Sequence, residues 1–281
     1  MVSEAPGRTL SDQLRAAGSA LGDRDEAARL AALALEKPLS WIFAHADEPL
    51  DQRLAERFAE MVSRRAQGVP FAYIAGSRGF FGREFSVSPA VLIPRPETEH
   101  IVEWSLALPL PDNARVVDVG TGSGCIILSL AAVRPDWKCT ATDVSREALA
   151  VAAINRERLQ LSHVRLLHGQ LLEPLDESRV DLVVSNPPYV AADAPHLKNG
   201  DIRFEPEIAL ASGPDGLGHL KALVESAPRF LSDGGWLLLE HGYDQAAAVR
   251  DLFRSKGYRN IETRCDLAGI ERVTGGTRPA F

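Results

Sequence analysis

The sequence Asn186-Pro187-Pro188-Tyr189 combines residue types that can hold a planar NH2 group. It follows an apolar run, residues 180–185, that is typical of a buried strand, so the amide and the ring fall at the strand's carboxyl end. Open α/β sheets bind their ligands at that edge. Each proline fixes φ and removes a backbone donor, while its carbonyl stays free to accept a hydrogen bond. An ordinary strand-to-loop turn explains the isolated motif about as well, because Asn-Pro is a common turn signal.

A glycine-rich loop, Gly120-Thr121-Gly122-Ser123-Gly124, lies between an expected strand and the helix after it. Its glycines allow a tight turn and a close approach of the backbone to a ligand. The spacing differs from the dinucleotide-binding fingerprint and from a P-loop, and no Lys-Ser or Lys-Thr pair follows to hold phosphates. Loop geometry alone remains the alternative explanation of these glycines.

Asp143 ends the second expected strand, at the position where an acid accepts hydrogen bonds from ribose hydroxyls. Its alternative role is to cap the next helix, for which Ser145 is also available. After the third strand, Leu171 is placed to pack on an adenine ring and Gln170 to bond its edge, although core packing explains Leu171 equally well. The short glycine loop favours S-adenosylmethionine over a nicotinamide dinucleotide.

This ordered set resembles class I methyltransferases that modify an exocyclic or amide nitrogen. Such a nitrogen is a weak nucleophile because its lone pair is delocalised. If the Asn186 side-chain oxygen and the Pro187 carbonyl each accept one N–H, they localise the lone pair and direct it at the methyl carbon. Tyr189 would stack on the planar group. Asn186, Pro187 and Tyr189 are therefore the expected catalytic residues. The sulfonium supplies the electrophile, so we expect no metal.

Further segments make the chain similar, over nearly its whole length, to the HemK-type glutamine methyltransferases that act on peptide chain release factors. These segments are the glycine loop, Val91–Glu99 (VLIPRPETE), Asn186–Tyr189, Arg203–Pro206, Gly213–Leu217 and Glu240–Gly242. The resemblance implies methyl transfer from S-adenosylmethionine to the side-chain amide nitrogen of the glutamine in a Gly-Gly-Gln motif. The implied product is S-adenosylhomocysteine, and the implied partner is a release factor.

The resemblance also implies which residues bind each ligand. The implied cofactor residues are Gly120, Thr121, Gly122, Ser123, Gly124, Asp143, Gln170, Leu171 and Asn186. The implied glutamine pocket comprises Asn186, Pro187, Pro188 and Tyr189, with Leu92 as a wall. Two positions depart from the family, which often has an acid in place of Gln170 and an aromatic residue in place of Leu171.

From about residue 115 onward, strands alternate with helices, which predicts a doubly wound, mainly parallel seven-stranded sheet. The expected strands are residues 116–119, 138–142, 164–168, 180–185, 236–240, 258–263 and 270–274. The expected helices are residues 124–133, 145–160, 218–231 and 243–256. We expect Thr98 to cap the helix that follows it.

The N-terminal part is expected to be a small helical bundle. Asp23 and Glu26 have capping-box spacing, and a second helix is expected from about residue 50 to 66. Glycines and aromatics alternate between Tyr73 and Val87, which suggests a β-hairpin. The predicted domains are a helical substrate-recognition domain (1–72), a β-hairpin linker (73–95) and a methyltransferase domain (96–281).

The composition narrows the choice of partner. The formal charge of −7 argues against a large nucleic-acid footprint, because such binding depends on many phosphate contacts. Three distant cysteines argue against a disulfide framework and a zinc site. No export signal or membrane-length apolar run is present, so we expect a cytoplasmic protein with no membrane partner.

Three alternatives remain open. The first alternative is an adenine-N6 DNA methyltransferase, since the amino group of adenine would present the same two N–H donors to Asn186. Such an enzyme also needs a region that grips and flips a base. A ribosomal-protein glutamine methyltransferase would share every catalytic residue. A non-enzymatic binding protein is disfavoured by the intact Asn186 and glycine loop.

Overall fold

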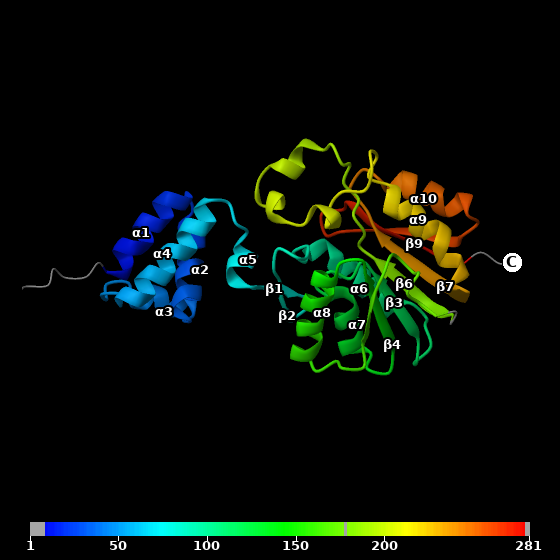
Figure 1. The fold of residues 1–281 in the computed structure, drawn as a ribbon, viewed down its shortest axis with the longest axis horizontal. Coiled ribbons are helices and arrows are strands. Elements are labelled where there is room, and N and C mark those ends of the chain that lie inside the picture. Colours follow the sequence, from blue (N-terminus) through cyan, green and yellow to red (C-terminus); the bar gives the residue numbers. More distant parts are fainter. Residues whose placement is uncertain (1–8, 177–178, 279–281) are drawn as a thin grey trace, which may run out of the picture. The chain divides into compact units, whose positions relative to one another are not determined.

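The computed structural model describes residues 9–176 and 179–278, and the chain divides into two compact units between Ala75 and Gly76 (Figure 1). Each unit has its own hydrophobic core. The first residues of the chain, where we expect no export signal, lie outside the described ranges. Within those ranges, no helix has both the length and the apolar character that crossing a membrane requires.

The first unit is helical. Its helices are α1 (Leu10–Leu21), α2 (Arg24–Leu35), α3 (Leu39–Ala44), α4 (Gln52–Ala66) and α5 (Phe71–Ala75). Helix α2 is capped by Asp23, whose carboxylate accepts hydrogen bonds from the backbone N–H groups of Asp25 and Glu26, both at 2.9 Å. The second half of the predicted capping box is replaced by an ion pair of Glu26. The Glu26 carboxylate pairs with Arg65 of α4 at 3.0 Å. Buried Phe58 of α4 packs in the core that α1, α2 and α4 share.

The second unit opens with the expected β-hairpin. Strands β1 (Ser77–Phe80) and β2 (Arg83–Ser86) pair antiparallel. The connecting residues Phe81 and Gly82 have positive φ angles of 47° and 70°, the combination that suits a two-residue hairpin turn. Tyr73, which we included in the hairpin segment, lies in α5.

The second unit is built on a seven-stranded sheet with the order β5-β4-β3-β6-β7-β9-β8. Its strands are β3 (Arg115–Val119), β4 (Lys138–Asp143), β5 (Arg165–His168), β6 (Val180–Ser185), β7 (Leu231–Glu240), β8 (Arg259–Cys265) and β9 (Glu271–Thr277). All neighbours are parallel except β9, which is antiparallel to β7 and β8. The predicted doubly wound sheet is confirmed. Because the strand order reverses beside β3, a crevice is expected at the carboxyl ends of β3 and β6.

Helices cover both faces of this sheet. They are α6 (Glu99–Ala107), α7 (Cys125–Val133), α8 (Arg146–Arg158), α9 (Gly218–Ser226) and α10 (Ala246–Ser255). Successive strand residues point to opposite faces. Val116 therefore packs in a core with residues of α6 and α7, whereas Val117 packs in a second core with residues of α9 and α10. Because β3 and β6 are parallel neighbours, the glycine loop after β3 and Asn186 after β6 lie at the same edge of the sheet.

One expected helix is shorter than predicted. Helix α9 ends at Ser226 and is followed by a 3-10 turn, Ala227–Arg229, rather than continuing to residue 231. Pro228 explains the end, because proline lacks an N–H and cannot bond the carbonyl four residues earlier. That carbonyl, of Val224, instead accepts a hydrogen bond from the Tyr258 hydroxyl at 3.0 Å. Strand β7 takes up the residues that follow.

The predicted cap at Thr98 is wrong. Thr98 lies in a 3-10 turn, η1 (Pro96–Thr98), with φ −66° and ψ −19°, and its side chain makes no capping hydrogen bond. A capping residue needs an extended backbone, which places its oxygen over the first N–H groups of the helix. The Thr98 hydroxyl instead accepts a hydrogen bond from Asn186.

Candidate active site

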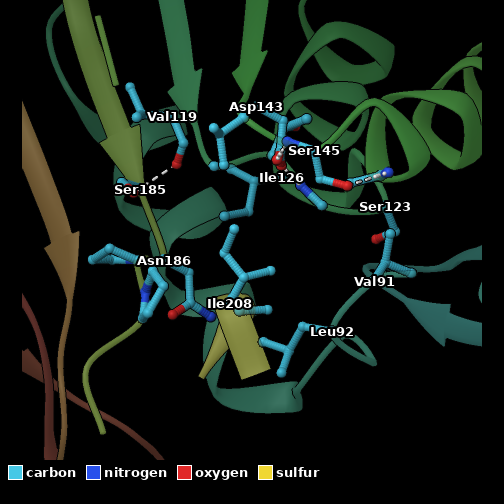
Figure 2. A pocket seen from close by; sticks show the side chains of 18 of the residues that line it. Val91, Leu92, Val119, Ser123, Ile126, Asp143, Ser145, Ser185, Asn186 and Ile208 are labelled. Carbon is cyan, nitrogen blue, oxygen red and sulfur yellow. Dashed lines mark hydrogen bonds between the residues drawn. The ribbon is translucent and has the colours of Figure 1, made fainter. Parts of the chain in front are cut away.

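A cavity of about 330 Å3 lies at the carboxyl ends of the parallel strands (Figure 2). The predicted residues that line it are Leu92, Gly120, Thr121, Gly122, Ser123, Asp143, Gln170, Leu171, Asn186, Pro187 and Pro188. Gly124 and Tyr189 are not among the lining residues. Gly124 begins α7 with a φ of 81°, and a Cβ there would lie only 2.9 Å from Leu128 Cδ1. Its role is therefore to let the loop pack closely on the helix.

The glycine loop presents backbone to this cavity. Gly120 and Gly122 have φ angles of 69° and 56°, and a Cβ at either position would meet no atom within 4 Å. The Thr121 hydroxyl donates to Asp118 Oδ2 at 2.6 Å, which ties the loop to β3. We gave Asp118 no role from the sequence. Burial raises the pKa of Asp118 to about 7, even though the Thr121 hydrogen bond lowers it.

Asp143 and Ser145 have separate roles. The Ser145 hydroxyl caps α8 by accepting from the Ala148 N–H at 3.0 Å. Asp143 Oδ2 accepts from the Gly122 N–H and Oδ1 from the Ser145 N–H, each at 2.9 Å. Burial raises the pKa of Asp143, while hydrogen bonds from these backbone groups lower it. The carboxylate is thus fixed beside the glycine loop, and each oxygen retains a lone pair for a further hydrogen bond.

Buried Asn155 of α8 joins the glycine loop to the hairpin. Its Nδ2 donates to the carbonyls of Ser123 at 2.8 Å and Ser86 at 3.0 Å. Its Oδ1 accepts from the Ser86 N–H at 2.7 Å. One side chain therefore satisfies backbone groups of both β2 and the loop.

A smaller cavity of about 190 Å3 adjoins the first. Tyr189, Val190, Ile202 and Leu210 line the smaller cavity only. Both cavities are lined by Leu92, Arg95, Asn186, Pro187 and Ala209. Asn186 and Pro187, which carry the predicted acceptor oxygens, therefore lie where the two cavities meet.

Asn186 is held from two sides. In the preceding residue, the Ser185 hydroxyl donates to the Val119 carbonyl at 2.6 Å and so joins the ends of β6 and β3 (Figure 2). The Asn186 Nδ2 donates to Thr98 Oγ1 at 3.0 Å. The amide nitrogen is thereby engaged by the protein, and Oδ1 is left as the acceptor available to a ligand.

Tyr189 is fixed at both its backbone and its ring. Its carbonyl accepts from Gln245 Nε2 at 2.9 Å, and Gly216 packs so closely that a Cβ there would lie 2.3 Å from that carbonyl oxygen. Its hydroxyl donates to Glu240 Oε1 at 3.4 Å, a long hydrogen bond. The phenol therefore points toward the end of β7.

Glu205 clamps two segments of the second cavity. Its side chain is only 1% exposed, and Oε2 accepts from the Ile93 N–H at 3.0 Å. Its Oε1 pairs with the Arg95 guanidinium. The Arg203–Pro206 segment is thereby fastened to the segment that carries Leu92.

Sequence reasoning missed the roles of Thr98, Glu205 and Glu240. Thr98 resembled a helix cap, and the other two acids occurred in segments noted only for family resemblance. For Glu240 a signal was available. Glu240 ends β7, which is parallel to β6, and Ser185 lies opposite Leu239. Once the strand order is known, Glu240 is therefore expected beside the Asn186 turn.

Two family models match the chain: PrmC N-terminal domain over residues 8–76 and Methyltransferase small domain over residues 105–200. The chain is 46% identical over 269 residues to the release factor glutamine methyltransferase of Xylella fastidiosa strain Temecula1, covering 95% of this chain and 98% of the relative. It is 47% identical over 247 residues to the release factor glutamine methyltransferase of Pseudomonas aeruginosa, covering 88% and 90%.

A methyltransferase from Pyrococcus furiosus has a similar fold, with a TM-score of 0.55 and 19% identity over 80% of this chain and 100% of that chain. This likeness supports the class I methyltransferase fold. The identity and coverage of the relatives go further, because they span both the helical N-terminal unit and the sheet. The chain belongs to the release factor glutamine methyltransferase family.

Proposed function

We propose that this chain transfers a methyl group from S-adenosylmethionine to the side-chain amide nitrogen of the glutamine in the Gly-Gly-Gln motif of a peptide chain release factor. S-adenosylhomocysteine is the second product. The observation that carries the proposal is the position of Asn186 and Pro187 in the walls of two adjoining cavities. A methyl donor in the larger cavity and an amide in the smaller one would meet at these two residues.

The larger cavity suits S-adenosylmethionine. Its volume lies within the range of ordinary small-molecule sites. Gly120 and Gly122 allow backbone contact, and the Asp143 carboxylate is placed to accept hydrogen bonds from ribose hydroxyls. Leu171 offers an apolar surface for adenine, and Gln170 a polar contact to its edge. When bound, the cofactor supplies an electrophilic methyl group on a sulfonium.

The smaller cavity suits the glutamine side chain. The Asn186 Oδ1 and the Pro187 carbonyl accept the two N–H groups of the amide and orient its nitrogen. They also withdraw the nitrogen lone pair from conjugation, which raises its nucleophilicity. Pro188 stiffens the turn, and Leu92 and Tyr189 form part of the walls of the smaller cavity.

We assign the recognition of the release factor to residues 1–72, the linker to residues 73–95 and the chemistry to residues 96–281. The independent helical core and the match to the PrmC N-terminal domain support the first assignment. We expect no stable binding to nucleic acid, because the chain carries a formal charge of −7. We also expect a cytoplasmic location.

The test offers labelled S-adenosylmethionine and the full-length chain to four substrates. They are a release factor, the same factor with its loop glutamine replaced, a ribosomal protein and duplex DNA. We expect label on the unmodified release factor alone. Label on DNA or on the ribosomal protein, with none on the release factor, would overturn the proposal.

A further inference from the structure

We propose that Thr98 and Glu240 are positioning residues that fix the orientation of the Asn186 carboxamide, so that Oδ1 rather than Nδ2 is offered to the substrate. This inference rests on the proposed function and deepens it. Thr98 ends η1, and Glu240 ends β7. Neither residue belongs to the site predicted from the sequence.

The orientation of the Asn186 carboxamide matters because its two ends have opposite roles. Oδ1 accepts hydrogen bonds, whereas Nδ2 only donates them. A glutamine NH2 is itself a pair of donors, so it can bind Oδ1 but finds no acceptor at Nδ2. A flipped Asn186 would fill the same space and leave the substrate amide unbound.

Thr98 cannot select the orientation by itself. A hydroxyl both donates and accepts, so it can bind either end of the carboxamide. In the structure Asn186 Nδ2 donates to Thr98 Oγ1 at 3.0 Å, which requires the Thr98 proton to point elsewhere. That proton can point to the buried Glu240 carboxylate, because the Thr98 hydroxyl lies close enough to it to lower its pKa. An ionised carboxylate only accepts, so Thr98 must act as the acceptor toward Asn186.

The surroundings of Glu240 favour this arrangement. Glu240 is 1% exposed, so its carboxylate depends on protein donors. Tyr189 donates to Oε1 at 3.4 Å, and Oε2 is buried and accepts no hydrogen bond of ordinary geometry from the described residues. A buried acceptor that lacks donors costs free energy. The carboxylate therefore favours the Thr98 rotamer whose proton points toward it.

The arrangement predicts a dependence on pH, because it requires ionised Glu240. Burial raises the pKa of Glu240 to about 7. The Thr98 and Tyr189 hydroxyls and the charge of Arg272 on β9 lower this pKa, and Glu97 on η1 raises it.

From α7, the Cys125 thiol also faces Glu240, and burial keeps it neutral by raising its pKa. When Glu240 gains a proton, it can donate to Thr98. Thr98 is then free to donate to Asn186 Oδ1, which favours the inactive flip. We therefore expect activity to fall on acidification through pH 7.

The experiment compares the full-length wild type with Thr98→Val, Thr98→Ser and Glu240→Gln. Methylation of a release factor is followed from pH 6 to pH 8, and S-adenosylmethionine binding is measured by calorimetry. At pH 8 we expect Thr98→Val to lower kcat about tenfold, with Thr98→Ser within about twofold of wild type. The cofactor Kd should stay within about twofold in every variant.

The pH profile separates positioning from a merely structural role. Wild-type activity should fall by up to about tenfold from pH 8 to pH 6. Thr98→Val should not show this fall in activity at low pH (the acid limb of the profile), although Glu240 still titrates. The variant lacks the hydroxyl through which Glu240 acts on Asn186. Glu240→Gln should lack the acid limb too. Thr263→Val, which removes a hydroxyl on β8 outside both cavities, is the matched control and should keep the wild-type profile.

Wild-type kcat together with an intact acid limb in Thr98→Val would overturn the inference. So would a tenfold loss in Thr98→Val that comes with an equal loss of cofactor affinity. If the wild type itself labels no release factor, the proposed function fails instead, and the two failures are thereby distinguished.

Discussion

The buried carboxylate of Glu205 accepts a hydrogen bond from the Ile93 N–H at 3.0 Å, across 112 residues of sequence. Its other oxygen pairs with Arg95, which lines both cavities. We expect Glu205→Gln to raise the KM for the release factor several-fold, because the clamp shapes the smaller cavity. Urea unfolding should show a loss of about 1–2 kcal/mol, since a charged hydrogen bond to the backbone is weakened.

The control for this clamp is Glu225→Gln. Glu225 forms an exposed ion pair with Lys256 at 2.9 Å, and exposed ion pairs contribute little to stability because water screens them. Equal effects of the two substitutions on KM and on unfolding would show that Glu205 does not shape the cavity.

Gly216 and Gly213 form a matched pair. Both have a positive φ, 72° and 71° respectively, so alanine strains the backbone equally at either position. A Cβ at Gly216 would lie 2.3 Å from the Tyr189 carbonyl oxygen, whereas one at Gly213 would meet nothing within 4 Å. We expect Gly216→Ala to displace Tyr189 and to lower kcat/KM for the release factor at least tenfold more than Gly213→Ala does. Steady-state kinetics on both variants checks this, and equal losses would contradict it.

Removing the Asn186 carboxamide should abolish transfer without unfolding the chain. We expect Asn186→Ala to lower kcat by about 100- to 1000-fold, the usual effect of losing one oriented group at a reacting centre. The thermal midpoint should stay within a few degrees of wild type. Asn113→Ala, in the exposed loop before β3, is the control and should leave kcat unchanged. Near-normal turnover by Asn186→Ala would remove Asn186 from the mechanism.

Asp143 should contribute to cofactor affinity. Asp143→Asn replaces a carboxylate that fixes the Gly122 N–H and, in our proposal, the ribose hydroxyls. We expect the calorimetric Kd for S-adenosylmethionine to rise about tenfold or more, which corresponds to at least about 1.4 kcal/mol. Asp136→Asn, in the loop that leads into the opposite end of β4, should bind normally. An unchanged Kd for Asp143→Asn would exclude Asp143 from the cofactor site.

Asp118 should make stability depend on pH. Burial raises its folded-state pKa from 3.8 to about 7, so the folded chain holds this proton more tightly than the unfolded chain does. That contribution is fully present below about pH 4 and is lost as pH rises through about 7. Relative to Asp118→Asn, the wild type should therefore lose about 4 kcal/mol of unfolding free energy between pH 4 and pH 8.

Urea unfolding of both proteins at several pH values measures this difference. Asp112→Asn changes an exposed carboxylate, and its unfolding free energy should depend on pH in the same way as that of the wild type. A constant difference between wild type and Asp118→Asn across this range would contradict the assignment.

The elements that frame the site were predictable because their signals are local. Buried parallel strands appear as apolar runs, and the run at residues 180–185 coincides with β6. The C-terminal end of α9 was predicted too late, although Pro228 stood in the sequence as a local signal. The cavity-lining residues on the glycine loop and on the Asn186 turn could be singled out in the sequence because special backbone geometry demands particular residue types.

Partners that are distant in sequence could not be predicted. Whether Thr98 caps a helix or binds Asn186 depends on contacts across 88 residues, and no local pattern reports those. Glu205 binds Ile93 only because the chain returns to the same edge of the sheet. To predict long-range polar contacts of this kind, one needs to know first the topology of the sheet and then the positions of the side chains.

The side chain of Asn155 has a thermodynamic consequence. Because it bonds both Ser123 in the glycine loop and Ser86 in the hairpin, the loop cannot shift without moving β2 or breaking a buried hydrogen bond. A ligand whose binding shifts the glycine loop would therefore also act on the hairpin. By reciprocity, a force on the hairpin would then change the affinity for that ligand by the same free energy with which the ligand changes the hairpin.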